Sequence, residues 1–388
     1  MALRVLRPQS REEALEYIKD TEADERSYPY LVPKTMGLCV EIKDLSARDA
    51  NIIKQEALSK GGDASISISA YSLKGTSRVL LIGSLKTLEE VAEKLYVQPI
   101  KNLKSLSGEI KRSVENYLSA PTFKVGDSCF EQTAVMGILN VTPDSFYDGG
   151  KYNTLELVAE RAEQIEREGG DMIDLGGQST RPGYVPVSLE EEKRRVIPAL
   201  RAIMESTEVR LPISIDTSKP EVAEEALKIG AGIINDQEGG GEKIAQLAAD
   251  YNASLILMHN RKVDSREMMF DIIEYLEESI NLAEKKGVEA ERISIDPGIG
   301  FGKNAEENLF LLKNLSELRS LGRAITIGAS RKSFIGKVLG GEKEERLEGS
   351  IAVLVSSVMS GAKIVRVHDV KESVLAAKMI DAIKQSYK

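Results

Sequence analysis

The sequence has few of the features that are typical of nucleic-acid-binding proteins, membrane proteins or proteins of oxidising compartments. Its net charge is −9 at pH 7 without a basic tail or stripe, which argues against nucleic acid or an anionic membrane as the main partner. Its two cysteines, Cys39 and Cys129, match no CxxC or Cys/His spacing, so we expect free thiols. No segment approaches the roughly 20 apolar residues of a membrane helix, and the N-terminus lacks the apolar run of a signal peptide. These absences predict a soluble, cytoplasmic protein.

Two nucleotide-binding signatures are also missing. No Gly-x-Gly-x-x-Gly follows the apolar run at 134–140, which argues against a dinucleotide-binding fold. The segment "DPGIGFGK" (296–303) is rich in glycine but lacks the Gly-Lys-Ser/Thr ending of a P-loop. What the sequence does have is 388 residues with 42% hydrophobic content, enough for one large domain or for two.

Short apolar runs alternate with helical stretches from about residue 135 to the end. The eight runs are 134–140, 171–177, 211–217, 232–236, 254–260, 293–298, 324–330 and 363–369. The stretches between them carry apolar residues at i, i+3 and i+4, and several end at a glycine, such as Gly170 or Gly287, as helices do. Apolar strands that alternate with amphipathic helices imply a parallel sheet covered by helices. Eight such units predict an α/β fold of the (β/α)₈ TIM barrel class rather than an open, doubly wound sheet.

The first 130 residues lack this rhythm and predict a smaller α/β or α+β N-terminal domain of unknown role. Strands are expected near 38–45, 64–71 and 78–85, with helices near 10–19, 46–62, 85–96 and 105–120. The segment 120–133 is a plausible joint, so we place the domains at 1–130 and 131–388.

Polar residues gather where the predicted barrel strands end, which is where TIM barrels build their active sites. These residues are Asn140, Asp174, Asp216, Asn235, His259, Asp296, Ser330 to Lys332, Arg366 and His368. Any one of them could be a turn or cap residue. Together they predict a site on one rim, because acids and amides at the ends of buried strands are costly unless they are hydrogen-bonded or used.

Arg366 and His368 suggest what this rim binds. They are two residues apart on an extended chain, so their side chains are expected on the same side. A guanidinium fork and an imidazole N–H suit a phosphate or a diphosphate, and TIM barrels often bind phosphate near strands 7 and 8. Arg331 and Lys332 follow strand 7, where a solvated basic face is the plainer alternative.

The ordered motifs of the barrel resemble those of the dihydropteroate synthase family. The resemblance covers about 136–388 and depends on the blocks "GILNVTPDSFYDGG", "GGQSTRPG", "SIDT", "IND", "LMH", "DPGIGFGK", "GASRKSFIG" and "RVHD". It implies a transferase of folate biosynthesis that joins 6-hydroxymethyl-7,8-dihydropterin diphosphate to 4-aminobenzoate, giving 7,8-dihydropteroate and diphosphate. Because an aromatic amine is neutral at pH 7, this reaction requires no strong general base.

The resemblance also implies a role for individual residues. The residues implied to bind the pterin are Asp216, Asn235, Met258, Asp296 and Lys332, and those implied to bind the diphosphate are Asn140, Arg366 and His368, with Mg²⁺ on Asn140. The aminobenzoate site is implied to include Phe301 and Ser333. A catalytic role is implied for Asp144, Thr180, Arg181 and Lys332. The segments 140–150 and 177–183 resemble two mobile loops that close over the substrates. The implied partners are the two substrates, sulfonamide-type inhibitors and a second copy in a homodimer.

Some features depart from the family pattern or leave alternatives open. Gln178 stands where many relatives have Glu, and Asn260 where Met is common. A pterin-dependent methyltransferase barrel shares the fold and the pterin acids but would not need the anion cluster. A non-catalytic pterin-binding protein, or a synthase that uses a modified aminobenzene, are further alternatives. The segment 54–65 is similar to N-terminal segments of some prokaryotic relatives, but no role follows from it.

Overall fold

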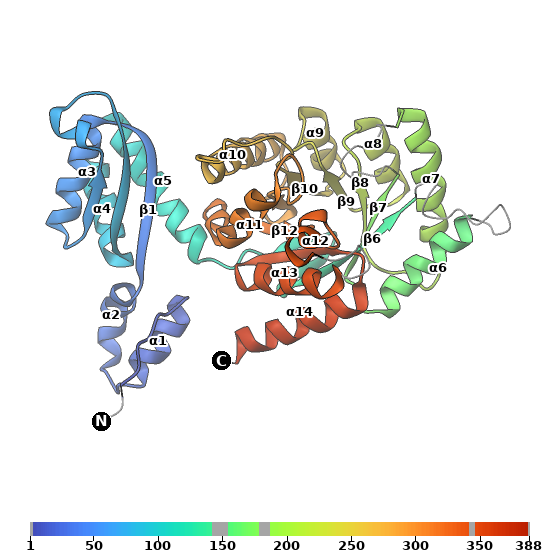
Figure 1. Cartoon of the computed structure of the whole chain (residues 1–388), viewed down its shortest axis with the longest axis horizontal. Coiled ribbons are helices and arrows are strands. Elements are labelled where there is room, and N and C mark those ends of the chain that lie inside the picture. The colour runs from blue at the N-terminus through green and yellow to red at the C-terminus, as the bar shows by residue number, and fades with distance from the viewer. Residues whose placement is uncertain (1–2, 142–153, 178–186, 341–345, 387–388) are drawn as a thin grey trace. The chain divides into compact units, whose positions relative to one another are not determined.

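The computed structural model describes residues 3–141, 154–177, 187–340 and 346–386 (Figure 1). They divide into two compact units, with the boundary between Ser119 and Ala120. In the part of the chain that the structure describes, no helix combines the length and the apolar character needed to cross a membrane.

The N-terminal unit is a three-stranded antiparallel sheet with helices packed on it. Its strands follow the order β1-β3-β2. The elements are α1 (Arg11–Lys19), α2 (Tyr28–Thr35), β1 (Gly37–Ser46), α3 (Ala47–Ser59), β2 (Asp63–Ile66), β3 (Thr76–Ser84), α4 (Leu85–Val97) and α5 (Lys101–Leu118). Their shared core includes the fully buried side chains of Ile53, Leu81, Leu88 and Leu103, so this unit has a hydrophobic core of its own.

This unit differs from the sequence prediction in two places. The strand expected at 64–71 ends at Ile66, because the Ser67 N–H donates to Ser77 Oγ and the chain then enters a 3₁₀ turn at Ile68–Ser72. Helix α2 was not predicted, since "YPYLVPKT" contains two prolines. The first, Pro29, falls in the opening turn of the helix, where an N–H has no intrahelical partner in any case.

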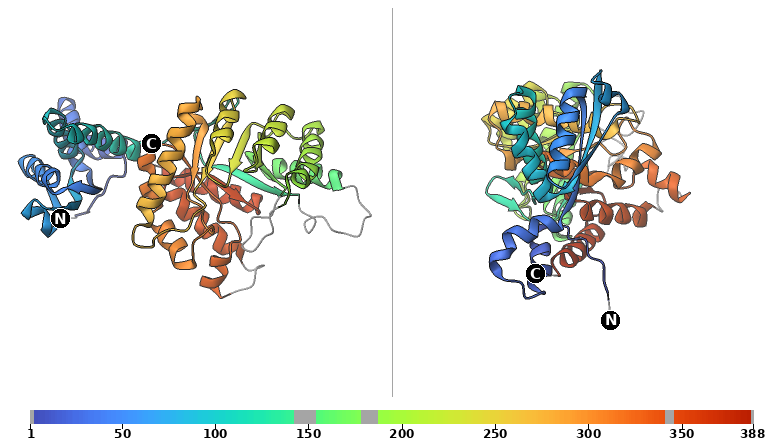
Figure 2. Two further views of the ribbon diagram at one scale, coloured as in Figure 1. Left: turned by 90° about the horizontal axis from the view of Figure 1, so that it is seen from above. Right: turned by 90° about the vertical axis from the view of Figure 1, so that its left-hand side faces the viewer.

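The second unit is a closed barrel of eight parallel strands within the described residues, as the sequence predicts. The strands are β6 (Ala134–Asn140), β7 (Met172–Gly176), β8 (Ile213–Asp216), β9 (Ile233–Asp236), β10 (Ser254–Met258), β11 (Ile293–Asp296), β12 (Ala324–Ile327) and β13 (Ala362–Val367). The helices are α6 (Thr154–Arg167), α7 (Leu189–Glu205), α8 (Pro220–Ile229), α9 (Glu242–Asp250), α10 (Met268–Lys286), α11 (Ala305–Lys313), α12 (Ser333–Leu339), α13 (Leu347–Met359) and α14 (Val370–Gln385). Figure 2 shows these helices on the outside of the strands.

A hairpin that the sequence analysis placed in the N-terminal domain belongs to the barrel unit. Strands β4 (Phe123–Val125) and β5 (Ser128–Phe130) pair with each other, and Phe123 is fully buried beside Met136 and Met172 at the start of the barrel strands. The boundary therefore lies before residue 120 rather than after 130. A short hairpin gives no sequence signal of its partner, and only barrel closure creates the apolar space that Phe123 fills.

Strand alternation explains why the barrel interior becomes polar at one end. Outward residues such as Leu175 join the hydrophobic layer beneath the helices, whereas every second residue faces inward. On β7 the inward positions run from Met172 to Asp174, and on β13 from Ile364 to Arg366. The carboxyl ends of the strands thus carry inward polar side chains, and the opposite end is apolar.

Candidate active site

An arginine held between two acids lies at the centre of the barrel mouth. Arg366 Nε donates to Asp174 Oδ2 (2.5 Å) and Arg366 Nη2 donates to Asp216 Oδ2 (2.7 Å). The Asn235 amide donates to Asp174 at 3.2 Å, and the Gln237 amide donates to Asp216 at 2.6 Å. The exposed fractions of the three charged side chains are 15% for arginine, 0% for Asp174 and 5% for Asp216. Strands β7, β8, β9 and β13 therefore contribute to one buried network.

Burial and charge act in opposite directions within this network. Burial raises the pKa of Asp216 to about 7, although the Arg366 charge opposes the rise. Burial alone would lower the pKa of Arg366, but the carboxylates of Asp174 and Asp216 outweigh it and raise that pKa above its usual range. Arg366 is therefore charged, and a ligand that donates hydrogen bonds to Asp216 would favour the ionised form of this acid.

A second acid and a lysine complete the mouth. Asp296 Oδ1 accepts from the Gly298 N–H at 2.7 Å, and burial raises the pKa of this acid. Lys332 Nζ donates to the Ile299 carbonyl and lies 4.0 Å from the ring centroid of Phe301. Burial lowers the pKa of Lys332 to about 7, against the pull of the Asp296 carboxylate. Both ionisable groups are thus desolvated at the same place.

Two observations place Asp296 beside other residues of the rim. Met258 is buried and is the register partner of Asp296 on the neighbouring strand. A Cβ placed on Gly328 would lie 3.9 Å from Asp296 Oδ2 and 3.7 Å from Arg366 Cδ, so the acid and the arginine approach the same point. Because Gly328 has no side chain, the space between Asp296 and Arg366 stays open.

The glycine-rich loop after β11 is organised around a buried lysine. Lys303 Nζ lies 3.1 Å from His259 Nδ1 and 3.2 Å from each of the Gly298 and Phe301 carbonyl oxygens. Burial lowers the pKa of Lys303 to about 8 and that of His259 to about 4, so the imidazole is neutral and can accept from the ammonium. Gly298 has φ of +72°, and a Cβ there would lie 2.1 Å from the His259 carbonyl oxygen. The loop therefore folds around an internal cation.

Replacing Lys303 by methionine is expected to destabilise the barrel. The change leaves several buried acceptors without a donor, and each such group costs about 1–3 kcal/mol. We expect the free energy of unfolding to fall by at least about 2 kcal/mol, measured by denaturant unfolding. Lys313→Met, at an exposed position of α11, is the matched control. An unchanged unfolding midpoint for Lys303→Met would contradict this interpretation of the loop.

Asn140 ends β6 on the same rim, facing Asp216. A Cβ on Gly176 would lie 3.2 Å from Asn140 Oδ1 and 3.5 Å from Asp216 Oδ2, so both oxygens border one small space. Among the described residues, no group of three or more His, Cys, Asp or Glu side chains could hold a metal ion. The rim does not form a protein cage for a metal. It does fit an ion such as Mg²⁺, which keeps several waters and takes other oxygens from a phosphate-bearing substrate.

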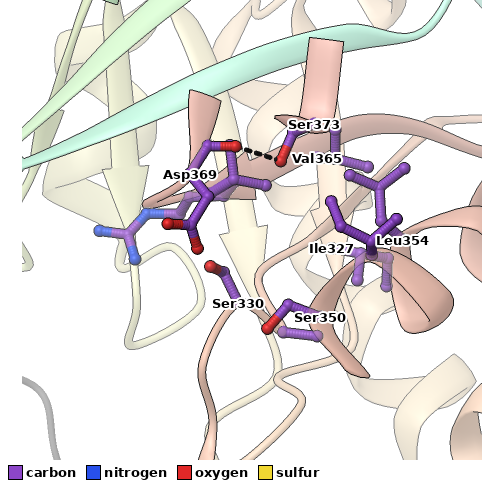
Figure 3. Close-up of a pocket in the computed structure, with 11 residues that line it drawn as sticks. Ile327, Ser330, Ser350, Leu354, Val365, Asp369 and Ser373 are labelled. Atoms are coloured by element: carbon purple, nitrogen blue, oxygen red, sulfur yellow. Dashed lines mark hydrogen bonds between the residues drawn. The ribbon is translucent and has the colours of Figure 1, made fainter. Parts of the chain in front are cut away.

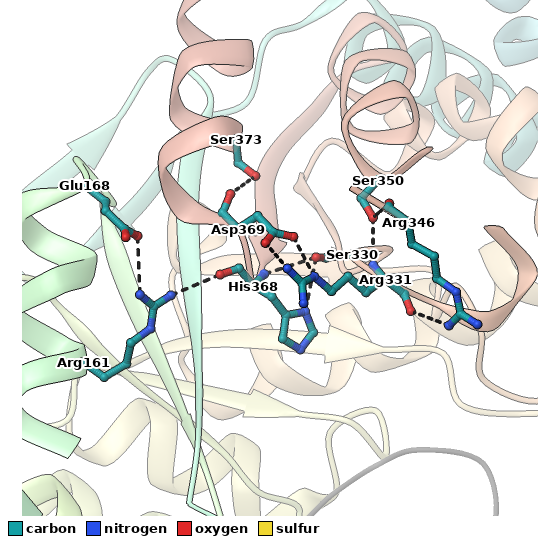
Figure 4. Close-up of polar contacts among 9 residues, drawn as sticks. All are labelled: Arg161, Glu168, Ser330, Arg331, Arg346, Ser350, His368, Asp369 and Ser373. Carbon is teal, nitrogen blue, oxygen red and sulfur yellow. Dashed lines mark hydrogen bonds and ion pairs between the residues drawn. The ribbon is translucent and has the colours of Figure 1, made fainter. Parts of the chain in front are cut away.

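The side chains that follow β12 and β13 differ in what they contact. His368 donates its backbone N–H to Ser330 Oγ (3.2 Å), and its Nδ1 lies 3.2 Å from the same oxygen (Figure 4). Arg331 pairs with Asp369, whereas its neighbour Lys332 reaches into the mouth. Of the two cations predicted after strand 7, only one therefore lies in the candidate site. Ser333 is exposed at the start of α12.

Most of the site residues predicted from sequence thus meet at one end of the barrel. Asp144, Thr180 and Arg181 lie outside the described residues. The sequence analysis assigned no role to Asp174, Gln237 or Lys303, which the structure places within the polar networks. The sequence could have indicated Asp174 as a site residue, because it is an acid near the end of a predicted strand. Gln237 lies in a connecting loop, where no such indication exists.

Comparison with known proteins shows the family to which the barrel belongs. The family described as pterin binding enzyme matches residues 136–368. A dihydropteroate synthase of Clostridium beijerinckii is 48% identical over 267 residues, which cover 67% of this chain and 98% of that protein. The solved structure of dihydropteroate synthase from Xanthomonas albilineans in complex with 7,8-dihydropteroate is 37% identical, with a TM-score of 0.63, and the match covers 68% of this chain and 99% of that chain.

One relative matches beyond the barrel. A probable bifunctional folylpolyglutamate synthase/dihydropteroate synthase of Halobacterium salinarum is 39% identical over 355 residues, which cover 88% of this chain and 42% of that protein. The barrel unit begins at Ala120, so this match also includes part of the N-terminal unit. The comparisons confirm the synthase family predicted from the motifs over the methyltransferase alternative. The chain therefore belongs to the pterin-binding enzyme family, within which it groups with the dihydropteroate synthases.

Proposed function

We propose that this chain condenses 6-hydroxymethyl-7,8-dihydropterin diphosphate with 4-aminobenzoate, giving 7,8-dihydropteroate and diphosphate. The observation that carries the proposal is the meeting of buried acids with buried cations at one barrel mouth: Asp216 and Asp296 with Arg366 and Lys332. A pterin presents amino and ring N–H donors beside a carbonyl, and its diphosphate tail is an anion. This rim offers acceptors and positive charge within a few ångströms of each other.

In this proposal the pterin ring lies at the barrel mouth, against side chains from β8 to β11. The Asp296 carboxylate accepts from the amino and ring N–H groups, and Lys332 donates to the carbonyl side. Asp216 and Asn235, which are register partners on β8 and β9, bind the other edge of the ring. The Met258 side chain packs on the ring face.

The reaction exchanges one bond for another at the pterin methylene carbon. The bond from this carbon to the bridging oxygen breaks, and its electron pair leaves with the diphosphate. The lone pair of the aromatic amine forms the new C–N bond, and the amine then loses a proton to solvent. Arg366 and His368 contribute most to catalysis in this proposal, because hydrogen-bond donors placed where negative charge develops stabilise the transition state.

Mg²⁺ is the cofactor that fits this proposal, with the Asn140 oxygen as its protein ligand at the rim. When bound, it would supply positive charge to the diphosphate oxygens. The half-buried ring of Phe301 and the exposed hydroxyl of Ser333 are the described residues proposed for the aminobenzoate. Catalytic parts for Asp144, Thr180 and Arg181 remain predictions, as does a homodimer.

The test is incubation with the pterin diphosphate and 4-aminobenzoate, scored by mass spectrometry for dihydropteroate and by a diphosphate assay. We expect both products in equal amounts. Sulfonamides, as aminobenzoate mimics, are expected to compete with the amine only after the pterin diphosphate or diphosphate has bound. Absence of diphosphate release would contradict the proposal, and so would equal sulfonamide binding with and without the pterin substrate. Incorporation of a modified aminobenzene in preference to 4-aminobenzoate would favour the variant synthase.

A further inference from the structure

Arg331 has a backbone conformation that its side chain does not favour. Its φ is +56°, in the left-handed region that non-glycine residues enter only at an energetic cost. It lies between Ser330 and Lys332 in the loop that joins β12 to α12. Such a conformation persists only where the surroundings hold it in place.

Three side chains in or just before α13 and α14 hold this residue (Figure 4). Its N–H donates to Ser350 Oγ of α13 at 2.9 Å, and its carbonyl accepts from Arg346 Nη1, just before α13, at 3.1 Å. Its guanidinium donates to both oxygens of Asp369: Nε to Oδ2 at 2.9 Å, and Nη2 to Oδ1. The Arg331 backbone and side chain are therefore anchored separately, and the two-pronged ion pair is the strongest single contact.

Asp369 is well suited to this contact. It precedes α14 as its N-cap residue, yet its side chain makes no capping hydrogen bond. Its carboxylate is bonded to Arg331 instead, and its side chain is only 14% exposed. Asp369 follows His368 directly, so the ion pair joins the chain after β12 to the chain after β13.

Packing does not fill the space behind this loop. A pocket there is lined by Ser330, Ser350, Asp369 and Ser373, over a floor of Ile327, Leu354 and Val365 (Figure 3). Because this side of the loop is not fully packed, the polar contacts of Arg331 help to fix the position of the loop.

The residues on either side of Arg331 contact residues of the candidate site. Ser330 Oγ accepts the backbone N–H of His368, and Lys332 Nζ reaches the Ile299 carbonyl above the Phe301 ring. We propose that Arg331 and Asp369 are positioning residues, whose ion pair sets the loop so that Ser330 meets His368 and Lys332 reaches the barrel mouth. The inference rests on the proposed function, because the groups it positions are those assigned to the pterin and the diphosphate.

Three substitutions separate the side-chain fork from the backbone conformation. Arg331→Gly suits φ of +56° but removes the guanidinium, Arg331→Lys keeps the charge without the fork, and Asp369→Asn keeps the shape without the charge. We expect each to lower kcat/KM for the pterin diphosphate by about 10- to 100-fold, mostly through kcat, because small displacements of positioning groups cost that much. Arg194→Lys is the matched control, since Arg194 makes an equally two-pronged pair with Glu191 on the exposed face of α7.

A second readout does not depend on turnover. Hydrogen exchange of the peptide that covers residues 329–335 is expected to speed up in the three variants and to stay unchanged in the control. The proposed function fails if the wild-type chain makes no dihydropteroate. The positioning role fails if the wild type turns over and Arg331→Gly and Asp369→Asn match it in both kcat/KM and exchange. Should Arg331→Gly not fold, Arg331→Lys and Asp369→Asn decide the question, and full activity of both would overturn the proposal.

Discussion

Asp296→Asn is expected to lower kcat/KM for the pterin diphosphate by on the order of 10³-fold, since its loss affects several hydrogen bonds to one substrate. The substitution keeps the size of the side chain but replaces an acceptor oxygen with an NH₂ donor. A pterin edge that presents N–H groups would then face a donor in a buried site, where an unpaired polar group cannot be solvated. The Asp296 Oδ1 contact with the Gly298 N–H shows that one oxygen already holds the loop, so the other is the one available to a ligand.

Asp236 provides a matched control for this change. It ends β9 as Asp296 ends β11, and its Oδ1 accepts the N–H of Glu238, two residues on, at 2.9 Å. Its register partner is Leu257, a residue of the hydrophobic layer beneath the helices. We expect Asp236→Asn to lower the unfolding midpoint while kcat/KM falls far less. Equal losses of kcat/KM for the two variants would mean that Asp296 acts through the fold alone. Calorimetric titration with the pterin diphosphate separates binding from turnover.

Removal of Mg²⁺ is expected to reduce turnover by at least about 100-fold, because neutralising a leaving diphosphate is worth several kcal/mol. The melting temperature of the substrate-free protein is expected to stay the same in excess chelator. The reason is structural: the described residues contain no cluster that could hold the ion without the diphosphate. Mg²⁺ would therefore enter with its substrate, as it does where phosphates supply most of its ligands.

The Asn140 side chain connects the ion to the protein in this prediction. Asn140→Ala is expected to raise the Mg²⁺ concentration needed for half-maximal turnover, with the melting temperature little changed. Full activity of the wild type in excess chelator would overturn the metal assignment. Unaltered Mg²⁺ dependence of Asn140→Ala would leave Mg²⁺ in place but remove Asn140 as its ligand. Restoration of activity by added Mg²⁺ controls for damage by the chelator.

Much of the site was predictable because strand ends are visible in the sequence. Asp216 and Asp296 each end an "ISID" run, and inward alternation on a closed barrel brings such residues to one mouth. The same reasoning located Lys332 and Arg366, but it did not show which of the rim acids the arginine contacts. Contacts within loops, such as those of Lys303 with the carbonyls around it, depend on backbone angles that a sequence does not display.

The barrel, the rim and the family could be predicted from the sequence alone, because the period of the apolar residues and the order of the motifs are local properties. Which charged side chains contact each other depends on the folded barrel. Arg366 contacts Asp174 across 192 residues of chain, and they become neighbours only when β13 pairs with β6, which lies beside β7. The tertiary structure also decides that Arg331 turns to Asp369 while Lys332 turns inward, and that Phe123 fills the far end of the barrel. Each of these side-chain positions depends on the space that remains after the strands have closed into a barrel. Adjacent residues of one loop can therefore point in different directions.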